Sequence, residues 1–263
     1  MPSLFEHITY ATGDGVATIT LDRPRHFNAM SMAGMREIID ALDQAGNDRQ
    51  VRVTVLTATG DVFCAGADIK ELPDPVTPLV GYEMVGLYLK AVETMRALSQ
   101  PVVARVNGPA HGGGCCLALG ADLRVASDNA SFSLPFVNLG LSGADMAATY
   151  LLPRLIGYGR ACELLMLGES IDAQEAQRIG LVNRVVPREA LDAATQSIVA
   201  RLRTRPPVGL GFTKRALQGS LDRDWRGQLE HEQLAQTLCL LTEDFAEGRQ
   251  AFVEKRTANF KGR

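Results

Sequence analysis

Two short stretches of glycine and alanine could present backbone N–H groups to a ligand oxygen. Gly112–Gly114 follows an apolar strand-like run, Val102–Val106, and precedes the apolar segment Cys115–Gly120, which predicts a buried helix. Ala65–Ala67 follows a second such run, Val53–Leu56. The N-terminus of a helix carries unpaired N–H groups and a positive dipole end. Two such amides converging from separate loops would form an oxyanion hole, which stabilises an enolate or an alkoxide.

Three side chains near these stretches could carry chemistry, and each also has a structural interpretation. His111 precedes the glycines and could reach a ligand or simply pack there. Cys116 lies in an apolar helix with no histidine nearby in sequence, which favours a packed thiol over a nucleophile. Asp145 begins a predicted helix, Met146–Leu155, where it would be an N-cap or a general base. The helix dipole would lower its pKa and burial would raise it, so the direction stays open.

The alternation of predicted strands and helices indicates an α/β core that would position these residues. The predicted elements are a hairpin of Ile8–Ala11 and Val16–Leu21, helices at Met32–Gly46 and Tyr82–Leu98, and strands at Val51–Leu56, Val102–Val106 and Asp122–Ala126. Tyr150 is expected in the core. From about Leu191 onward the pattern is almost entirely helical. We therefore predict a core over residues 1–200 and a helical region over residues 201–263.

Composition excludes several classes of protein. The 263 residues are 46% hydrophobic and 22% charged, with a net charge of -3 and no basic patch, which argues against a nucleic-acid partner. No apolar run is long enough to span a membrane and no signal peptide is recognisable, so we expect a cytoplasmic protein without membrane association. The five cysteines lack metal-ligand spacing, so no metal site is expected.

Five motifs occur in an order and spacing that resemble one known family. They are LDRPRHFNAMS (Leu21–Ser31), FCAGADIKEL (Phe63–Leu72), NGPAHGGG (Asn107–Gly114), RIGLVNRVVP (Arg178–Pro187) and AFVEKRTANF (Ala251–Phe260). With them the chain resembles the enoyl-CoA hydratase/isomerase (crotonase) superfamily. The resemblance implies a spiral of ββα units and a C-terminal helical region that lies over a neighbouring subunit. It also implies a homotrimer or dimer of trimers, and an acyl-CoA substrate with no separate cofactor.

The resemblance assigns roles to particular residues of this chain. The amides of Ala67 and Gly113 would receive the thioester oxygen. Residues expected to bind coenzyme A or to line the site are Arg25, His26, Phe27, Ala29, Ala65, Asp68, Ile69, Lys70, Gly112, Cys116, Phe136, Phe252 and Lys255.

Two positions depart from the pattern of the family's hydratases, which use a pair of glutamates as acid and base. Here those positions hold Cys116 and Phe136, so the chain is expected to be an atypical member, with Phe136 shaping an apolar acyl pocket. Asp145 remains as the candidate base, because several relatives of other reaction type carry an acidic residue near this turn.

This residue set predicts double-bond isomerisation, or hydration by a nonstandard set of residues. One alternative is a noncatalytic acyl-CoA-binding protein. Another is an enzyme like the aroyl-CoA dehalogenases or hydrolases, although the Asp145 loop is one residue longer than in the dehalogenases and Tyr82–Leu98 lacks the histidine of that branch. A nicotinamide dehydrogenase is disfavoured because the spaced glycine fingerprint is missing.

Overall fold

The computed structural model describes residues 5–263 and contains two sheets. The larger sheet has the strand order β1-β2-β3-β4-β6-β9. Its strands are β1 (Ile8–Gly13), β2 (Val16–Leu21), β3 (Val53–Ala58), β4 (Val102–Val106), β6 (Leu123–Ser127) and β9 (Arg184–Val186). The hairpin β1-β2 is antiparallel, and every other neighbouring pair in this sheet is parallel. The smaller sheet joins β5 (Ala110–His111), β7 (Ser131–Ser133) and β8 (Ser170–Asp172).

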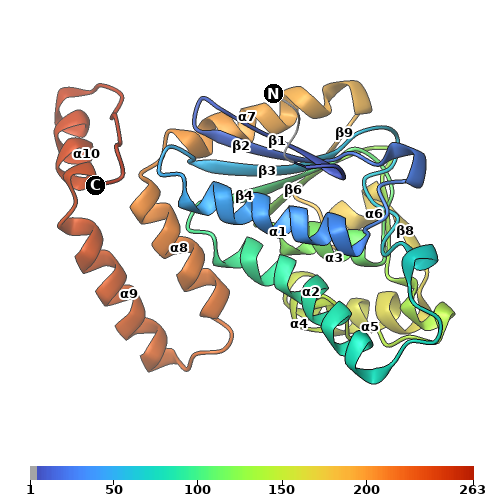
Figure 1. The fold of residues 1–263 in the computed structure, drawn as a ribbon. Coiled ribbons are helices and arrows are strands. Elements are labelled where there is room, and N and C mark those ends of the chain that lie inside the picture. Colours follow the sequence, from blue (N-terminus) through green and yellow to red (C-terminus); the bar gives the residue numbers. More distant parts are fainter. Residues whose placement is uncertain (1–4) are drawn as a thin grey trace.

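Helices cover both faces of the larger sheet (Figure 1). In chain order they are α1 (Met32–Asn47), α2 (Pro78–Ala97), α3 (Gly113–Gly120), α4 (Ala148–Ile156), α5 (Tyr158–Leu167), α6 (Ala173–Arg178), α7 (Leu191–Arg203), α8 (Pro207–Gly219), α9 (Trp225–Leu240) and α10 (Glu243–Glu254). Four short 3-10 helices are η1 (Pro24–His26), η2 (Ile69–Glu71), η3 (Pro135–Leu139) and η4 (Arg188–Ala190). Twice, the chain runs from a strand of the large sheet through a strand of the small sheet to an α-helix: β4, β5 and α3, and then β6, β7 and, after η3, α4. The predicted α/β class is confirmed.

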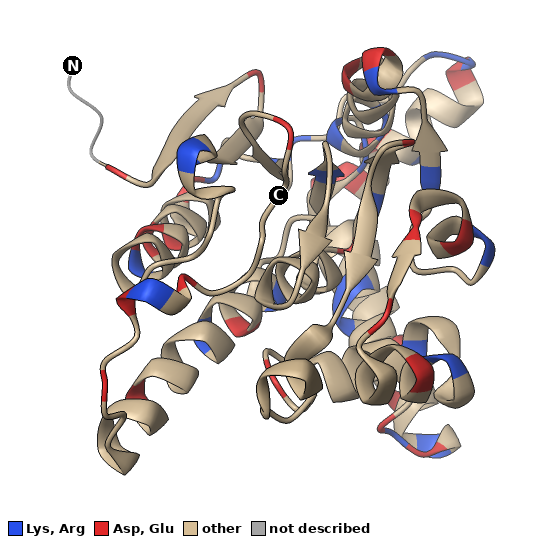
Figure 2. Cartoon of the chain, turned by 90° about the vertical axis from the view of Figure 1, so that its right-hand side faces the viewer, with Lys and Arg blue, Asp and Glu red and all other residues tan. Residues whose placement is uncertain are grey.

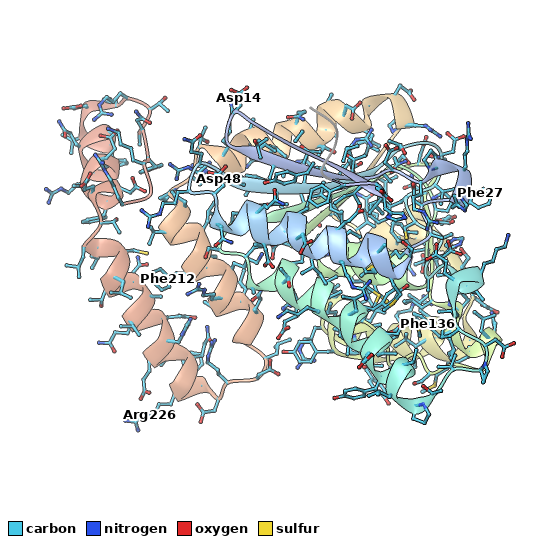
Figure 3. All side chains as sticks on the ribbon, in the orientation of Figure 1. Asp14, Phe27, Asp48, Phe136, Phe212 and Arg226 are labelled. Carbon is cyan, nitrogen blue, oxygen red and sulfur yellow. The ribbon has the colours of Figure 1, made fainter. Side chains whose placement is uncertain are left out.

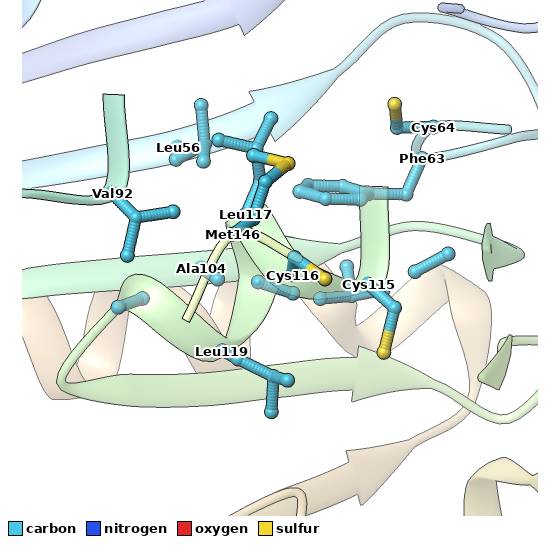
Figure 4. Close-up of a cluster of buried hydrophobic side chains, with 14 of the residues drawn as sticks. Leu56, Phe63, Cys64, Val92, Ala104, Cys115, Cys116, Leu117, Leu119 and Met146 are labelled. Carbon is cyan, nitrogen blue, oxygen red and sulfur yellow. The ribbon is translucent and has the colours of Figure 1, made fainter. Parts of the chain in front are cut away.

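The helix α3 lies in the centre of the hydrophobic core. All of its residues from Gly113 to Gly120 are buried, and it packs against α2 and α4. Figure 4 shows its side chains beside Phe63, Leu56 and Met146, which come from three other parts of the chain. A helix enclosed on every side has no amphipathic face, in agreement with its uninterrupted apolar sequence.

Most predicted elements are confirmed within a few residues, but the segment after Asp145 is not. The predicted helix Met146–Leu155 instead begins at Ala148, because Met146 and Ala147 have φ of +41° and +62°. Left-handed residues cannot continue a right-handed helix. The N-cap is Ala147 and no side chain caps this end. The interpretation of Asp145 as an N-cap is therefore wrong.

Tyr150 was expected in the core, and this prediction is also wrong. Its side chain is 37% exposed, and its hydroxyl donates a hydrogen bond to Asp222 in the connection between α8 and α9. Arg154 stacks over the Tyr150 ring at 3.5 Å and pairs with the same carboxylate at 2.7 Å. The polar partner is more than seventy residues away in sequence, so local periodicity could not reveal it.

The C-terminal helices contact the rest of the chain mainly through α8. The buried Lys214 of α8 forms an ion pair of 2.8 Å with Asp122 and donates to the carbonyl groups of Met95 and Gln100. Beyond it, α9 and α10 extend away from the sheets (Figure 1). Leu234, at 59% exposed, lies with Leu238 and Leu241 on the outside of this extension. The division between residues 1–200 and 201–263 stays a prediction.

Charged residues of both signs are interspersed over the face drawn in Figure 2. Among residues 5–263, no helix combines the length and the apolar character needed to cross a bilayer.

Candidate active site

The loop after β3 orients the N–H of Ala67 outward. The N–H of Met30 donates to the carbonyl of Gly66 at 2.8 Å, and the N–H of Asp68 donates to the carbonyl of Met30 at 2.9 Å. The C=O and N–H of a trans peptide point in opposite directions. The N–H of Ala67 therefore points away from Met30, and within residues 5–263 it meets no acceptor. Ala67 is exposed, so this amide is open to a ligand.

The second amide belongs to Gly113, the first residue of α3. Gly112 turns the chain into the helix with a φ of +52°, a conformation that favours glycine. A Cβ on Gly66 would lie 3.5 Å from the nitrogen of Gly113 and 3.1 Å from the carbonyl oxygen of His111. The absence of side chains thus lets the two loops meet. The oxyanion hole of the Ala67 and Gly113 amides stays a prediction, and this close approach of the two loops is what it requires.

Asp145 lies beside the first turn of α3. Its carbonyl oxygen is 3.9 Å from the thiol of Cys116, and a Cβ on Gly113 would lie 3.0 Å from the sulfur of Met146. The carboxylate accepts a hydrogen bond of 2.9 Å from the N–H of Met146. Burial raises the pKa of Asp145, although that hydrogen bond opposes the change. The sequence left open whether the pKa of Asp145 is raised or lowered. In the structure it is raised, so Asp145 is more basic than an exposed aspartate.

Phe136 and Cys116 lie beside this site, and neither side chain can serve as its general acid or base. Phe136 of η3 is buried, and its ring edge is 4.0 Å from where a Cβ on Gly112 would lie. Burial raises the pKa of Cys116 well above its ordinary value, so the thiol stays protonated. The thiol is therefore packed in the core and is not poised as a nucleophile.

His111 has the features of a structural residue. Its ring Nε2 is 3.0 Å from the hydroxyl of Ser131, and its backbone N–H donates to the carbonyl of Cys64 at 2.9 Å. Burial lowers the pKa of the imidazole, so the ring is neutral at neutral pH.

The chain is similar to known proteins over most of its length. A family model described as enoyl-CoA hydratase/isomerase matches residues 11–263. The chain belongs to the enoyl-CoA hydratase/isomerase family.

Named relatives and a solved structure extend the likeness over nearly the whole chain. A probable enoyl-CoA hydratase of Mycobacterium tuberculosis is 41% identical, with 93% of this chain and 89% of that protein covered. The 1,2-epoxyphenylacetyl-CoA isomerase of Escherichia coli is 34% identical over 99% of this chain and 100% of its own length. The crystal structure of an enoyl-CoA hydratase from Bacillus anthracis is similar with a TM-score of 0.94, at 36% identity over 98% of this chain and 100% of that one. The predicted crotonase-like fold is thereby confirmed.

Most of the residues predicted to contact coenzyme A lie on two adjoining segments. Arg25, His26 and Phe27 are exposed at η1 and just after it, and Ala29 is half-buried. Ala65, Ile69 and Lys70 are exposed on the segment that carries Ala67.

Two residues that the sequence analysis missed hold these segments together. Arg23 donates to the carbonyl of Ala29 at 2.7 Å and pairs with the carboxylate of Asp68 at 3.1 Å. The buried Asn28 donates to the carbonyl groups of Thr59 and Val62. The Asp68 side chain is thus engaged within the protein, and its backbone N–H and C=O are hydrogen-bonded to Met30 and Glu71.

Tyr88 of α2 is a third residue that sequence reasoning missed. It is buried, and its hydroxyl donates a hydrogen bond of 2.7 Å to the carbonyl of Met30. Met30 is the residue that orients the peptide between Gly66 and Ala67. Tyr88 therefore supports the first amide of the site from behind, an arrangement that helical spacing alone does not disclose.

The structure does not bring Phe252 and Lys255 to this site within one chain. Both lie at the end of α10, where Phe252 is 85% exposed. Figure 3 shows Phe27 and Phe136 at the opposite end of the molecule from Phe212, which lies on the side of the C-terminal helices. A contribution from Phe252 and Lys255 would need a second copy of the chain, and it stays a prediction.

Proposed function

We propose that this chain moves a double bond in an unsaturated acyl-CoA by proton transfer. The thioester oxygen accepts hydrogen bonds from the amides of Ala67 and Gly113. The carboxylate of Asp145 takes a proton from carbon 2 of a 3-enoyl thioester, which leaves a dienolate, and the same carboxyl group returns the proton to carbon 4. The observation that carries the proposal is the position of Asp145, which lies against the first turn of α3 with a raised pKa.

The surrounding residues favour isomerisation over ordinary hydration. Hydration by two glutamates would need carboxylates at positions 116 and 136, which hold a buried thiol and a phenyl ring. We therefore regard the chain as an atypical member of its family. The Escherichia coli relative is named an isomerase of an epoxide, so its name favours neither reaction.

Hydration by a nonstandard set of residues is the second candidate, and the name of the Mycobacterium tuberculosis relative favours it. It would use the same oxyanion hole, with Asp145 acting on a water molecule. A noncatalytic acyl-CoA-binding protein and a dehalogenase-like enzyme are further alternatives.

Incubation with 3-enoyl-CoA and 2-enoyl-CoA thioesters of several chain lengths in deuterated water tests the proposal. We expect interconversion of the two isomers, with deuterium entering at carbon 2 or carbon 4 in the turnovers in which the Asp145 proton exchanges with solvent. Formation of 3-hydroxyacyl-CoA would instead establish hydration. Binding without any turnover or exchange would establish a noncatalytic protein.

The activity should depend on pH through Asp145. The base works only when it is ionised, and burial raises its pKa. We expect kcat/KM to fall as the pH is lowered, with its inflection at a higher pH than an ordinary aspartate would give. The measurement is a pH profile of kcat/KM. A profile that stays flat down to the pH at which the protein unfolds would contradict this role.

Assembly through the C-terminal helices would complete the binding site. We expect α9 and α10 to pack on another copy, because the exposed Leu234, Leu238 and Leu241 form a broad apolar face. Phe252 and Lys255 would then reach the nucleotide end of coenzyme A held by the neighbouring copy. Light scattering at micromolar concentration should give the mass of a trimer or hexamer. A monomeric mass would contradict assembly, and Leu238→Glu should reduce the mass where the matched surface change Gln233→Glu does not.

A further inference from the structure

The helix that presents the amide of Gly113 has a buried arginine at its other end. Arg124 of β6 is 3% exposed. Its guanidinium donates to the carbonyl of Ala121 at 2.6 Å, and more weakly to those of Ala118 and Leu119 at 3.2 and 3.4 Å. These are carbonyl groups of the last turn and the C-cap of α3. They form the negative end of the helix dipole.

Among residues 5–263, no carboxylate forms a direct ion pair with Arg124, although the nearby charge of Asp122 attracts it. Its Nε donates to the carbonyl of Leu181 at 2.6 Å, while the neighbouring Asp122 pairs with Lys214. Burial lowers the pKa of Arg124 to about 10, so the group remains charged at neutral pH. A buried charge is costly unless dipoles or an opposite charge compensate it. Here the carbonyl groups at the end of α3 provide part of that compensation, together with the carbonyl of Leu181 and the charge of Asp122.

We propose that Arg124 is a positioning residue that strengthens the oxyanion hole electrostatically through α3. A short helix places a negative end close to its positive end, which weakens the field at Gly113. By neutralising the negative end, Arg124 leaves α3 with a net positive character towards the thioester oxygen. This inference rests on the proposed function, because it concerns how strongly the same oxyanion hole polarises its ligand.

The expected effect is on chemistry more than on binding. Eight residues separate the two ends by about 12 Å. At an effective dielectric constant of about 20, loss of one charge at this distance corresponds to about a tenfold fall in rate. In Arg124→Gln we therefore expect kcat to fall about tenfold with little change in KM, because charge on the oxygen is larger in the transition state than in the bound thioester.

The absorption band of a chromophoric thioester measures directly how strongly the protein polarises the thioester carbonyl group. 4-(Dimethylamino)cinnamoyl-CoA should absorb at longer wavelength when the two amides polarise its carbonyl group. We expect Arg124→Gln to lose much of the red shift seen with the unmodified protein, and Arg124→Lys to retain it near neutral pH because the charge is kept. Arg105→Gln is the matched control. Arg105 lies on the neighbouring strand β4 and pairs with Asp192 away from α3, so its loss should leave the absorption band unchanged.

The outcomes separate this inference from the proposed function. An unmodified protein that binds the probe without a red shift would contradict the oxyanion hole itself. Equal red shifts for the unmodified and Arg124→Gln proteins would overturn the role of Arg124 alone. If Arg124→Gln fails to fold, the pH dependence of the red shift in Arg124→Lys tests the role of Arg124 instead. A buried ammonium loses its proton more readily than a guanidinium. The red shift of Arg124→Lys should therefore fall as the pH rises from neutral, while that of the unmodified protein stays constant below the pKa of Arg124, which is about 10. A shift that stays equally constant in both would overturn the proposal.

Discussion

Replacing Asp145 with asparagine should lower kcat by about a hundredfold or more, the usual contribution of a general base. Asparagine keeps the size of the side chain and can still accept a hydrogen bond from the N–H of Met146, but it cannot take a proton. Steady-state kinetics with an unsaturated acyl-CoA measure the loss. The affinity for the thioester should change little, because the amides of Ala67 and Gly113 are untouched.

The stability of this variant provides the control. The pKa of Asp145 is raised in the folded protein, so the folded state binds the proton more tightly than the unfolded state. The resulting stabilisation is present at low pH and is lost as the pH rises through the folded pKa. At neutral pH the ionised carboxylate therefore costs stability, and Asp145→Asn should unfold at the same temperature or higher. A folded variant with the parent rate would show that Asp145 is not the base.

Replacing Gly113 with proline should cost roughly 3–4 kcal/mol of transition-state stabilisation, or about a hundredfold to a thousandfold in kcat. Proline removes one of the two N–H donors of the oxyanion hole. It is tolerated at the first position of a helix, because the N–H there has no intrahelical partner. Turnover of the best thioester found in the substrate panel measures the effect.

Gly113→Ala is the matched control for the change to proline. Either substitution adds a Cβ that would lie 2.5 Å from the terminal methyl group of Met30 and 3.0 Å from the sulfur of Met146, both on flexible side chains. Alanine retains the N–H, so it should lose much less activity than proline. Similar losses in the two variants would assign the effect to crowding and would remove Gly113 from the oxyanion hole.

Local patterns predicted the framework well because each element carries its own periodicity. Val102–Val106 forms β4 with the predicted bounds, and α1 extends the predicted Met32–Gly46 by one residue. These elements are specified by residues next to one another in the chain. The glycines that open α3 also carried their signal locally, through their position between an apolar strand and an apolar helix.

The parts that sequence reasoning missed depend on contacts between distant residues. Nothing near Tyr88 in sequence indicates that its hydroxyl reaches Met30, fifty-eight residues earlier. Arg124 resembles any charged residue in a strand until the end of α3 is placed against it. The left-handed conformation of Met146 and Ala147 delays the start of α4, and the preference of their residue types for helices gave no warning of it.

The strand order of the large sheet has a consequence for how the protein is made. Strands β1, β2, β3, β4, β6 and β9 lie side by side in the order in which they occur in the chain. Each strand joins the edge left open by the one before it, so no strand has to be inserted between two that are already paired. A chain emerging from the ribosome can therefore extend the sheet from its N-terminus. The leucines of α9, which we expect to contact another copy, emerge after both glycine loops have their supporting strands, so assembly would follow the folding of each core.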